Sequence, residues 1–475
     1  LAILYIIVMT VFLFGITIFV HEWGHFIVAK KCGLKIEAFS IGMGPALWKK
    51  EVDGILYKIG AFPIGGYVSL PQLDPAGMEK IQGDNDETDR AALPDVSPWK
   101  KIAVAVAGPF CNIVFAIFLA MVVSLAPVDA LIDEEGVIVS TVEESSAAYA
   151  AGLRSGDEIR AVNGNPVASW YDTRVESLLG SGNEKPVNFT IYNDTDGERV
   201  ISLPVNPPED AEALIEGVRE AHPCKIMQIV ADSPAEAAGL MPDDLITFID
   251  DVIIEGSSHF IDIIQENGDT EIILTLERDG RIMKLPVTPA YNKEHEAVMI
   301  GIQFAGALSM PWTLSGNPIE QINNDASSIF RLLKALTTPS ESKQAAGGLG
   351  GPVAIFTMIT IALKMGIINA IALTRFININ LAVLNLLPLP VLDGGHICFA
   401  LWEGITRRKV HPKVVATLVN VFAILLISAM LFLSWRDVDR NWGVSRFFRK
   451  APAEQVTEPA EPVAETMDMA VEPAN

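Results

Sequence analysis

The residues His21, Glu22 and His25 follow the pattern HExxH, and they are the part of this chain best suited to chemistry. On an α-helix, His21 and His25 lie on one face, about 6 Å apart along the axis. This spacing lets both imidazoles bind one zinc ion, while Glu22 serves as a general base toward water. Matches to five residues also arise by chance, so the surrounding sequence has to support this interpretation.

The twenty residues before His21, from Leu1 to Val20, are all uncharged, which is long enough to span a membrane. Ionisable side chains inside a bilayer are costly, and their presence indicates a functional site. We do not expect a cleaved signal peptide, because a basic start is missing and the segment ends in His and Glu. The combination predicts water-dependent chemistry inside a membrane.

A catalytic zinc site needs a third protein ligand and one open position. Asp393 is the only carboxylate in residues 342–402, and it follows an apolar segment that Pro388 and Pro390 interrupt. Non-helical backbone at membrane depth is tolerated only where it is buried in protein or lines a cavity. We therefore expect this segment to line the site. Asp393 is the candidate third ligand, and spacing alone leaves His396 as its rival.

The acidic charge of the chain is concentrated in its middle. The 475 residues carry a net charge of −23, and residues 128–300 alone hold 34 acidic and 11 basic residues. An acidic middle between apolar segments argues against nucleic-acid binding. The four cysteines are far apart and form no CxxC pair, so we expect packing residues rather than disulfides or a zinc ribbon. They are Cys32, Cys111, Cys224 and Cys398.

Hydropathy predicts four membrane spans. They cover about residues 1–29, 102–126, a part of 350–402, and 414–433. Lysines at both ends of residues 30–101 place that loop in the cytoplasm by the positive-inside rule, so the acidic middle lies on the outer side. The basic residues between 436 and 450 conflict with this rule after the last span.

The acidic middle contains an internal repeat with an offset of 87 residues. Residues 146–159 and 233–246 both read S-x-A-x-x-A-G-L-x-x-x-D-x-I. With the Val-Asn-Gly at 162–164, this pattern resembles PDZ domains, which bind an extended peptide by strand addition. We therefore expect two tandem PDZ-like domains, over 128–221 and 222–309. A peptide or protein ligand is the favoured role, and spacer domains without a ligand are the alternative.

Two motifs together, HEWGH at 21–25 and NLLPLPVLDG at 385–394, resemble the site-2 protease family of intramembrane zinc metalloproteases. The resemblance implies one zinc ion per chain on His21, His25 and Asp393, with Glu22 as the base. Residues 107–112 resemble the second-span motif of that family. The substrate-binding residues that the resemblance implies are Asn385, Pro388 and Pro390, together with Gly65, Gly66, Tyr67 and Val68 in a membrane-entering β-structure.

The resemblance also implies a function. It suggests an endopeptidase of the bacterial inner membrane that cuts single-span membrane proteins, namely a pre-trimmed anti-sigma factor and remnant signal peptides. The PDZ-like domains would then be periplasmic. One alternative is a non-enzymatic membrane scaffold with peptide-binding PDZ domains, although a scaffold needs no base such as Glu22. Another is a transporter with a proton path through Asp393, although transporter repeats lie in the membrane part and not in a soluble part.

These observations predict a mixed fold: a polytopic α-helical membrane protein with four spans, a membrane-associated β-hairpin region and two tandem PDZ-like α+β domains. An amphipathic pattern predicts a helix over 317–337, either packed against the protein or lying on the membrane. The predicted boundaries are 1–127 and 350–445 for the two halves of the membrane protease domain, 128–221 and 222–309 for the PDZ-like domains, 310–349 for linker helices, and 446–475 for a disordered tail.

Overall fold

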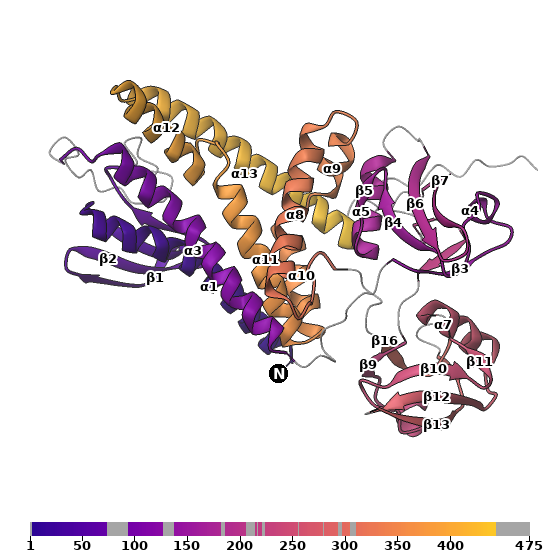
Figure 1. Ribbon diagram of the computed structural model, residues 1–475. Helices are drawn as coiled ribbons and strands as arrows, with labels where there is room; N and C mark the ends of the chain where they lie inside the picture. Colours follow the sequence, from indigo (N-terminus) through magenta and orange to yellow (C-terminus); the bar gives the residue numbers. More distant parts are fainter. Residues whose placement is uncertain are drawn as a thin grey trace, which may run out of the picture.

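The computed structural model describes most of the chain. It covers residues 2–73, 94–126, 137–181, 186–205, 214–215, 217–220, 224–254, 256–278, 280–292, 297–304 and 310–442. The predicted disordered tail, 446–475, lies outside the described residues. Long helices gather in one part of the molecule, and two β-rich modules lie beside them (Figure 1).

Four described helices are long and apolar enough to cross a membrane. They are α1 (Ala2–Cys32), α3 (Pro98–Ser124), α11 (Ile367–Asn385) and α13 (Pro412–Trp442). The pair α9 (Ser342–Gly348) and α10 (Pro352–Lys364) passes the same criteria when taken together, although it bends by 61° at its break. Counting this pair as a span would bring the number to five.

The apolar stretch 350–402 forms three helices rather than one interrupted crossing. Helix α10 ends before Gly366, whose φ of +118° suits glycine, and α11 begins directly after it. After the proline-containing loop, α12 (Asp393–Thr406) begins at the aspartate that the sequence singled out. The crossing predicted in this stretch therefore corresponds to α11, and Asp393 opens the following helix.

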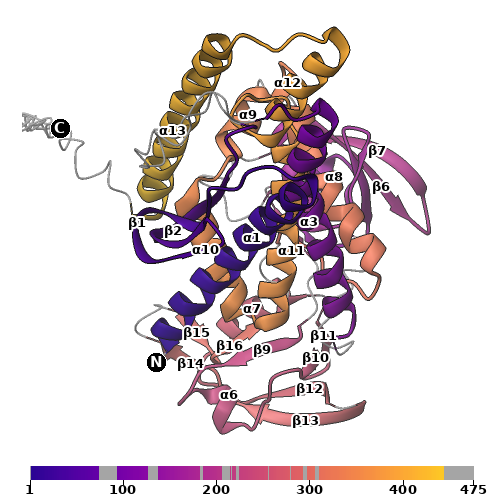
Figure 2. The same cartoon turned by 90° about the vertical axis from the view of Figure 1, so that its left-hand side faces the viewer.

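Helix α3 is central to the helical part, because it packs against α1, α11, α12 and α8 (Pro318–Thr337). Figure 2 shows α1, α3 and α11 lying side by side. The buried face of α3 consists largely of small residues, which allow the close approach of backbones that membrane helices use for packing. Among them are Ala105, Ala107, Gly108, Ala116 and Ala120.

The β-hairpin region predicted between the first two spans is present as β1 (Ala38–Val52) and β2 (Ile55–Ser69), which pair antiparallel. Asp53 and Gly54 join them, both with positive φ, as a tight hairpin turn requires. Residues 38–41 pair on one side with 56–59 and on the other with 66–69. Segment 66–69 is therefore an edge, and no other described strand pairs with its outer side.

The two copies of the sequence repeat form two β-rich modules with the same architecture. The first module consists of β3 (Val139–Val142), α4 (Ala147–Ala150), β4 (Glu158–Val162), β5 (Asn165–Pro166), α5 (Trp170–Gly180), β6 (Val187–Asn193), β7 (Gly197–Leu203) and β8 (Val218–Glu220). The second consists of β9 (Ile226–Ile229), α6 (Pro234–Ala237), β10 (Leu245–Ile249), β11 (Val252–Ile253), α7 (Ser257–Glu266), β12 (Ile272–Arg278), β13 (Arg281–Val287), β14 (Ala290–Asn292), β15 (Ala297–Met299) and β16 (Ile302–Phe304). Their four-stranded sheets have the orders β5-β4-β6-β7 and β11-β10-β12-β13, and the pairs β3–β8 and β16–β9 accompany them. The second module also has the pair β14–β15.

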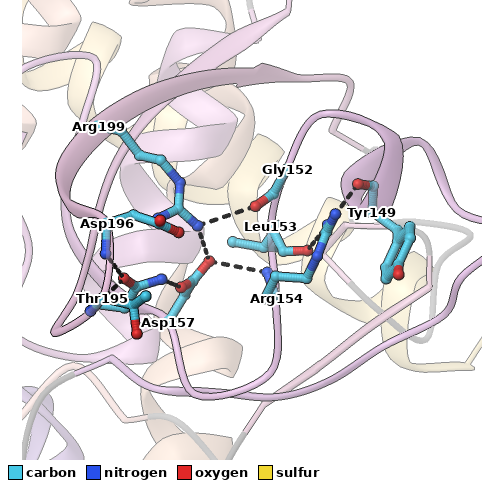
Figure 3. Close-up of polar contacts among 9 residues, drawn as sticks. Tyr149, Gly152, Leu153, Arg154, Asp157, Thr195, Asp196 and Arg199 are labelled. Carbon is cyan, nitrogen blue, oxygen red and sulfur yellow. Dashed lines mark hydrogen bonds and ion pairs between the residues drawn. The ribbon is translucent and has the colours of Figure 1, made fainter.

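The repeated aspartate of the first module is a buried hydrogen-bond acceptor that joins a turn to a β-hairpin. Asp157 is almost fully buried, and it accepts a hydrogen bond from Asn193 Nδ2 (2.6 Å). It also accepts hydrogen bonds from the backbone N–H of Arg154 (2.9 Å) and from Arg199 Nη2 (2.8 Å), as Figure 3 shows. The same guanidinium donates to the carbonyl of Gly152. A buried charge needs such partners, so this aspartate has a structural role.

The second module repeats this arrangement with an arginine from a different strand. Buried Asp244 accepts hydrogen bonds from the N–H of Met241 (2.9 Å) and twice from Arg278, at 2.7 Å each. Arg278 ends β12, whereas Arg199 lies in β7. Both copies of the repeat therefore have a buried aspartate that accepts a hydrogen bond within its own turn. The arginine that pairs with this aspartate comes from a different strand of the hairpin in each copy.

The amphipathic helix expected over 317–337 is α8, and it packs against protein, chiefly α3, α11 and α9. Arg331 reaches from its surface to Glu176 of α5 (2.6 and 2.8 Å) and to Glu341 (2.6 Å). On the buried side of α8, Asp325 forms an ion pair with Arg375 of α11 at 2.6 Å. Helix α8 thus contacts both the first β-rich module and a candidate membrane span.

A side chain from α13 caps the first turn of α10. Buried Asp437 accepts hydrogen bonds from the backbone N–H groups of Gly351 (2.8 Å) and Ala354 (2.9 Å). We expect Asp437→Ala to lower the free energy of unfolding by about 1–2 kcal/mol, because it removes both caps and a favourable charge at the helix N-terminus. Asp437→Asn should recover part of the loss. Unfolding of the full chain in detergent measures this, and equal stability of Asp437→Ala and the parent would contradict it.

Candidate metal centre and active site

The two motif histidines lie on the buried face of α1. His21 and His25 are each 8% exposed, and their Nε2 atoms are 3.2 Å apart. On its other side, His25 Nδ1 lies 2.8 Å from the backbone carbonyl oxygen of Val104 in α3. Because a carbonyl only accepts hydrogen bonds, Nδ1 carries a proton, and in the neutral ring Nε2 keeps its lone pair. The helix spacing brings the two Nε2 atoms close together, and the contact with Val104 orients the ring of His25 so that its Nε2 faces His21.

Asp393 completes the cluster from the far end of the chain. Its Oδ2 lies 3.3 Å from His21 Nε2, and its Oδ1 lies 3.4 Å from His25 Nε2. The next two residues must be glycines, because a Cβ at Gly394 would lie 2.1 Å from the carbonyl oxygen of Leu387. The first turn of α12 can therefore press against the loop that follows α11, and this contact places the carboxylate beside the histidines.

The donor set and its spacing fit a zinc ion. Ligands about 2.0–2.1 Å from a tetrahedral zinc lie about 3.3–3.4 Å from each other. The Nε2–Nε2 separation of 3.2 Å and the two Nε2–carboxylate separations of 3.3 and 3.4 Å come close to this value. Oδ2 of Asp393 is also buried without a hydrogen-bond partner in the described structure. His396, the rival ligand, does not belong to this three-residue group.

Glu22 lies between the cluster and the edge of the β-hairpin. Its carboxylate accepts a hydrogen bond from the backbone N–H of Val68. Gly66 touches the same region, because a Cβ there would lie 3.0 Å from Glu22 Cγ and 2.8 Å from Ile18 Cγ2. The outer side of segment 66–69 therefore faces α1 at Glu22. An extended peptide added to this edge would lie beside the glutamate.

The other residues predicted to bind substrate lie in the hairpin, at the end of α11 and in the loop that follows α11. Asn385, the last residue of α11, places Nδ2 3.4 Å from His21 Nε2. Tyr67 is buried, and Gly65 has a φ of +73°. In the loop after α11, Pro388 is exposed and Pro390 is buried, with its Cα 2.7 Å from the position of a Cβ on Gly395. Asn385 thus contacts a motif histidine directly.

Helix α3 contributes contacts to the site beyond those expected from the sequence motifs. A Cβ on Gly108 would lie 2.2 Å from His25 Nε2 and 2.9 Å from His21 Cε1, so no side chain fits there. One turn later, fully buried Asn112 lies 3.2 Å from His21 Nδ1. Both belong to the motif at 107–112, and their i, i+4 spacing on one helix face was the signal in the sequence.

The cluster consists of two imidazoles and a carboxylate, with a glutamate beside it. Together with the long apolar helices around it, this arrangement is that of a metalloprotease site built from candidate membrane helices. The chain belongs to Peptidase family M50, whose model matches residues 9–429. The predicted relationship to the site-2 proteases is thereby confirmed, and the chain is a metalloprotease.

Three relatives illustrate the similarity. The chain is 28% identical over 451 residues to the regulator of sigma-E protease RseP of Salmonella typhimurium, covering 90% of this chain and 96% of that protein. The protein of the same name from Escherichia coli is 28% identical over 446 residues, with the same coverage. The zinc metalloprotease RasP of Oceanobacillus iheyensis is 28% identical over 449 residues, covering 91% of this chain and 99% of that protein.

Two solved structures are also similar to part of the chain. The PDZ domain of the SdrC-like protein from Listeria monocytogenes is 23% identical, covers 17% of this chain and 85% of its own, and has a TM-score of 0.16. The PDZ domain of the SdrC-like protein from Listeria innocua is 21% identical, covers 19% of this chain and all of its own, and has a TM-score of 0.17.

Proposed function

We propose that this chain is an intramembrane zinc endopeptidase of the bacterial inner membrane, which cuts the transmembrane segments of single-span proteins. The observation that carries the proposal is the convergence of His21, His25 and Asp393 beside Glu22, among helices long and apolar enough to cross a membrane. A zinc site in a soluble protease does not need such helices, whereas a protease that acts within the bilayer does.

In this proposal, His21, His25 and Asp393 hold one zinc ion per chain, with Nε2 as the ligand atom of each histidine. A bound zinc ion would supply an electrophile for the peptide carbonyl and make water acidic enough to attack at neutral pH. Glu22 takes a proton from the attacking water and then delivers it to the amine that leaves. The N–H of Val68 holds the carboxylate of Glu22 in place between these two proton transfers.

The substrate has to be extended before it can be cut, because the carbonyl groups of a transmembrane helix are bonded within the helix. No other described strand pairs with the outer edge of segment 66–69 beside Glu22, and strand addition there would stabilise the extended form. The positive φ of Gly65 directs the chain into this edge. Asn385 lies within reach of a substrate backbone near His21, while Pro388 and Pro390 shape the loop that carries Asp393.

We also propose four spans, with residues 30–101 in the cytoplasm and two PDZ-like domains in the periplasm. The charge distribution of the sequence and the shared architecture of the two modules support this arrangement. Relatives named as regulators of sigma-E protease support a pre-trimmed anti-sigma factor as one substrate class. Remnant signal peptides are the second class. The domain boundaries given above stay predictions.

The second module contains a groove suited to a peptide ligand. A cavity of about 550 Å³ lies between α7 and β16, lined by Phe260 and Ile264 on one side and Ile302 and Phe304 on the other. An extended peptide with an apolar side chain fits such a groove by strand addition. Met365, from the turn between α10 and α11, also lines it. A non-enzymatic scaffold would also use this groove, but it does not explain why Glu22 lies beside the three potential zinc ligands.

The test is cleavage of a tagged single-span membrane protein that lacks its outer domain, co-expressed with the full chain. We expect a cut within the span that a membrane-permeable zinc chelator abolishes and added zinc restores, because the metal is required for the attack. A substrate with its bulky outer domain restored serves as the control. A cut outside the span, or cutting that survives removal of zinc, would contradict the proposal, and a chain that never cuts would favour the scaffold.

A further inference from the structure

Asn112 is a fully buried amide that touches a proposed metal ligand. It lies on α3, where its side chain is 0% exposed and its amide is 3.2 Å from His21 Nδ1. With the amide nitrogen nearest to His21, Oδ1 is left buried without a hydrogen-bond partner among the described residues. A buried polar atom of this kind is costly, and its orientation therefore needs an explanation.

The ring chemistry of His21 determines which amide atom should face it. His21 Nε2 lies 3.2 Å from His25 Nε2 and 3.3 Å from Asp393 Oδ2, so this nitrogen points into the cluster and must carry a lone pair to bind a metal. The proton of the neutral ring then belongs to Nδ1, which becomes a donor. A donor requires an acceptor, and Asn112 Oδ1 is one whereas Nδ2 is not.

Rotating the amide of Asn112 by 180° exchanges oxygen and nitrogen, which have nearly the same shape. After this rotation, Oδ1 accepts a hydrogen bond from His21 Nδ1 and no longer lies unpaired. His25 already shows the same arrangement, because its Nδ1 contacts the carbonyl of Val104, eight residues earlier on the same helix. Helix α3 would thus supply one acceptor to the outer nitrogen of each histidine.

We infer that Asn112 is a positioning residue: Oδ1 accepts the Nδ1 proton of His21 and so fixes the tautomer that presents Nε2 to zinc. This inference rests on the zinc site of the proposed function. Partners of this kind orient the ligand ring and raise its basicity, and their loss typically weakens metal binding 10–100-fold.

The direction of the hydrogen bond can be tested by substitution. In competition with a chromophoric chelator, the purified full chain with Asn112→Ala should bind zinc about 10–100-fold more weakly than the parent. Asn112→Asp should bind zinc within about threefold of the parent or more tightly, because a carboxylate can only accept a hydrogen bond. If the amide instead donates, Asn112→Asp would bind zinc as weakly as Asn112→Ala, and the inference would be overturned.

Asn378 offers a matched control in the same helical core. It is also fully buried, but it donates to Thr17 Oγ1 (3.1 Å) and the carbonyl of Thr374 (2.8 Å) rather than to a histidine. Asn378→Ala should leave zinc affinity at the parent value even if it lowers the unfolding temperature. Equal losses of zinc affinity in Asn378→Ala and Asn112→Ala would reduce Asn112 to a packing role.

The outcomes separate this inference from the proposed function. A parent chain that binds no zinc would contradict the proposed metal site itself. A parent that binds zinc tightly, with Asn112→Ala binding equally tightly, would overturn the role of Asn112 alone. Should Asn112→Ala fail to fold, the affinity of Asn112→Asp still decides between an accepting and a donating amide.

Discussion

Glu22→Gln is expected to lower the rate of cleavage within the membrane by about 10²–10⁴-fold or more, while zinc content stays at the parent level. Glutamine keeps the size of the side chain and can still accept the hydrogen bond from the N–H of Val68. It cannot take a proton from water, so only the proton transfer is lost. The rate of appearance of the cut product from a single-span substrate, together with zinc per chain by elemental analysis, measures both quantities.

Two further variants show that the loss comes from this position. Asp393→Ala should lose cleavage and zinc together, because it removes one of the three converging donors. Glu403→Gln makes the same chemical change on α12, at a carboxylate bonded to Lys101 at 2.7 Å, and should leave both quantities nearly unchanged. Substantial cleavage by Glu22→Gln, or loss of its zinc, would contradict the assignment of Glu22 as the base.

Arg375→Met is expected to lower the free energy of unfolding by about 3–5 kcal/mol. Arg375 and Asp325 are both 0% exposed, and two hydrogen bonds of 2.6 and 3.1 Å join them. The guanidinium also bonds to Gln321 Oε1 and to the carbonyl of Thr313. Removing it leaves a buried carboxylate without its counter-charge, which is far more costly than replacing both partners.

A double substitution and a pH series test this explanation. Arg375→Met with Asp325→Leu should recover most of the lost stability. Burial raises the pKa of Asp325, and the Arg375 guanidinium opposes this rise. Without the guanidinium, the folded state binds a proton more tightly than the unfolded chain does, so the deficit of Arg375→Met should shrink as the pH falls. Chemical unfolding of the full chain in detergent measures these values, and a pH-independent deficit would be inconsistent with an unpaired carboxylate.

The proposed zinc ligands and base could be singled out from the sequence, because residue type and spacing carry the signal. HExxH needs only the helical period, and Asp393 stood out as a lone acid in an apolar segment. Spacing did not separate Asp393 from His396. The structure brings Asp393, as the first residue of α12, into the cluster, and His396 is not part of that group. Which of the two residues joins the cluster depends on the residue at which α12 begins. Proline and glycine patterns in a sequence predict that residue only approximately.

The sequence could indicate that Gly108 and Asn112 share a helix face, but it could not predict which residues they contact, because these contacts join distant parts of the chain. The carbonyl of Val104 is 79 residues from His25, and Asn112 is 91 residues from His21. The ion pair of Arg375 with Asp325 depends on how α8 lies against α11, which the amphipathic pattern left open between protein and membrane. Hydropathy likewise could not divide 350–402 into three helices, since the break at Gly366 is a matter of backbone conformation.

The close approach of Gly108 gives the site one closed wall. Because even a methyl group at this position would overlap His25 Nε2, the backbone of α3 seals that side of the two imidazoles. In the proposed function, water and a peptide would therefore not approach through α3. Access to the reaction would be limited to the directions that α3 leaves open, and the hairpin edge beside Glu22 and the loop before Asp393 would border the path.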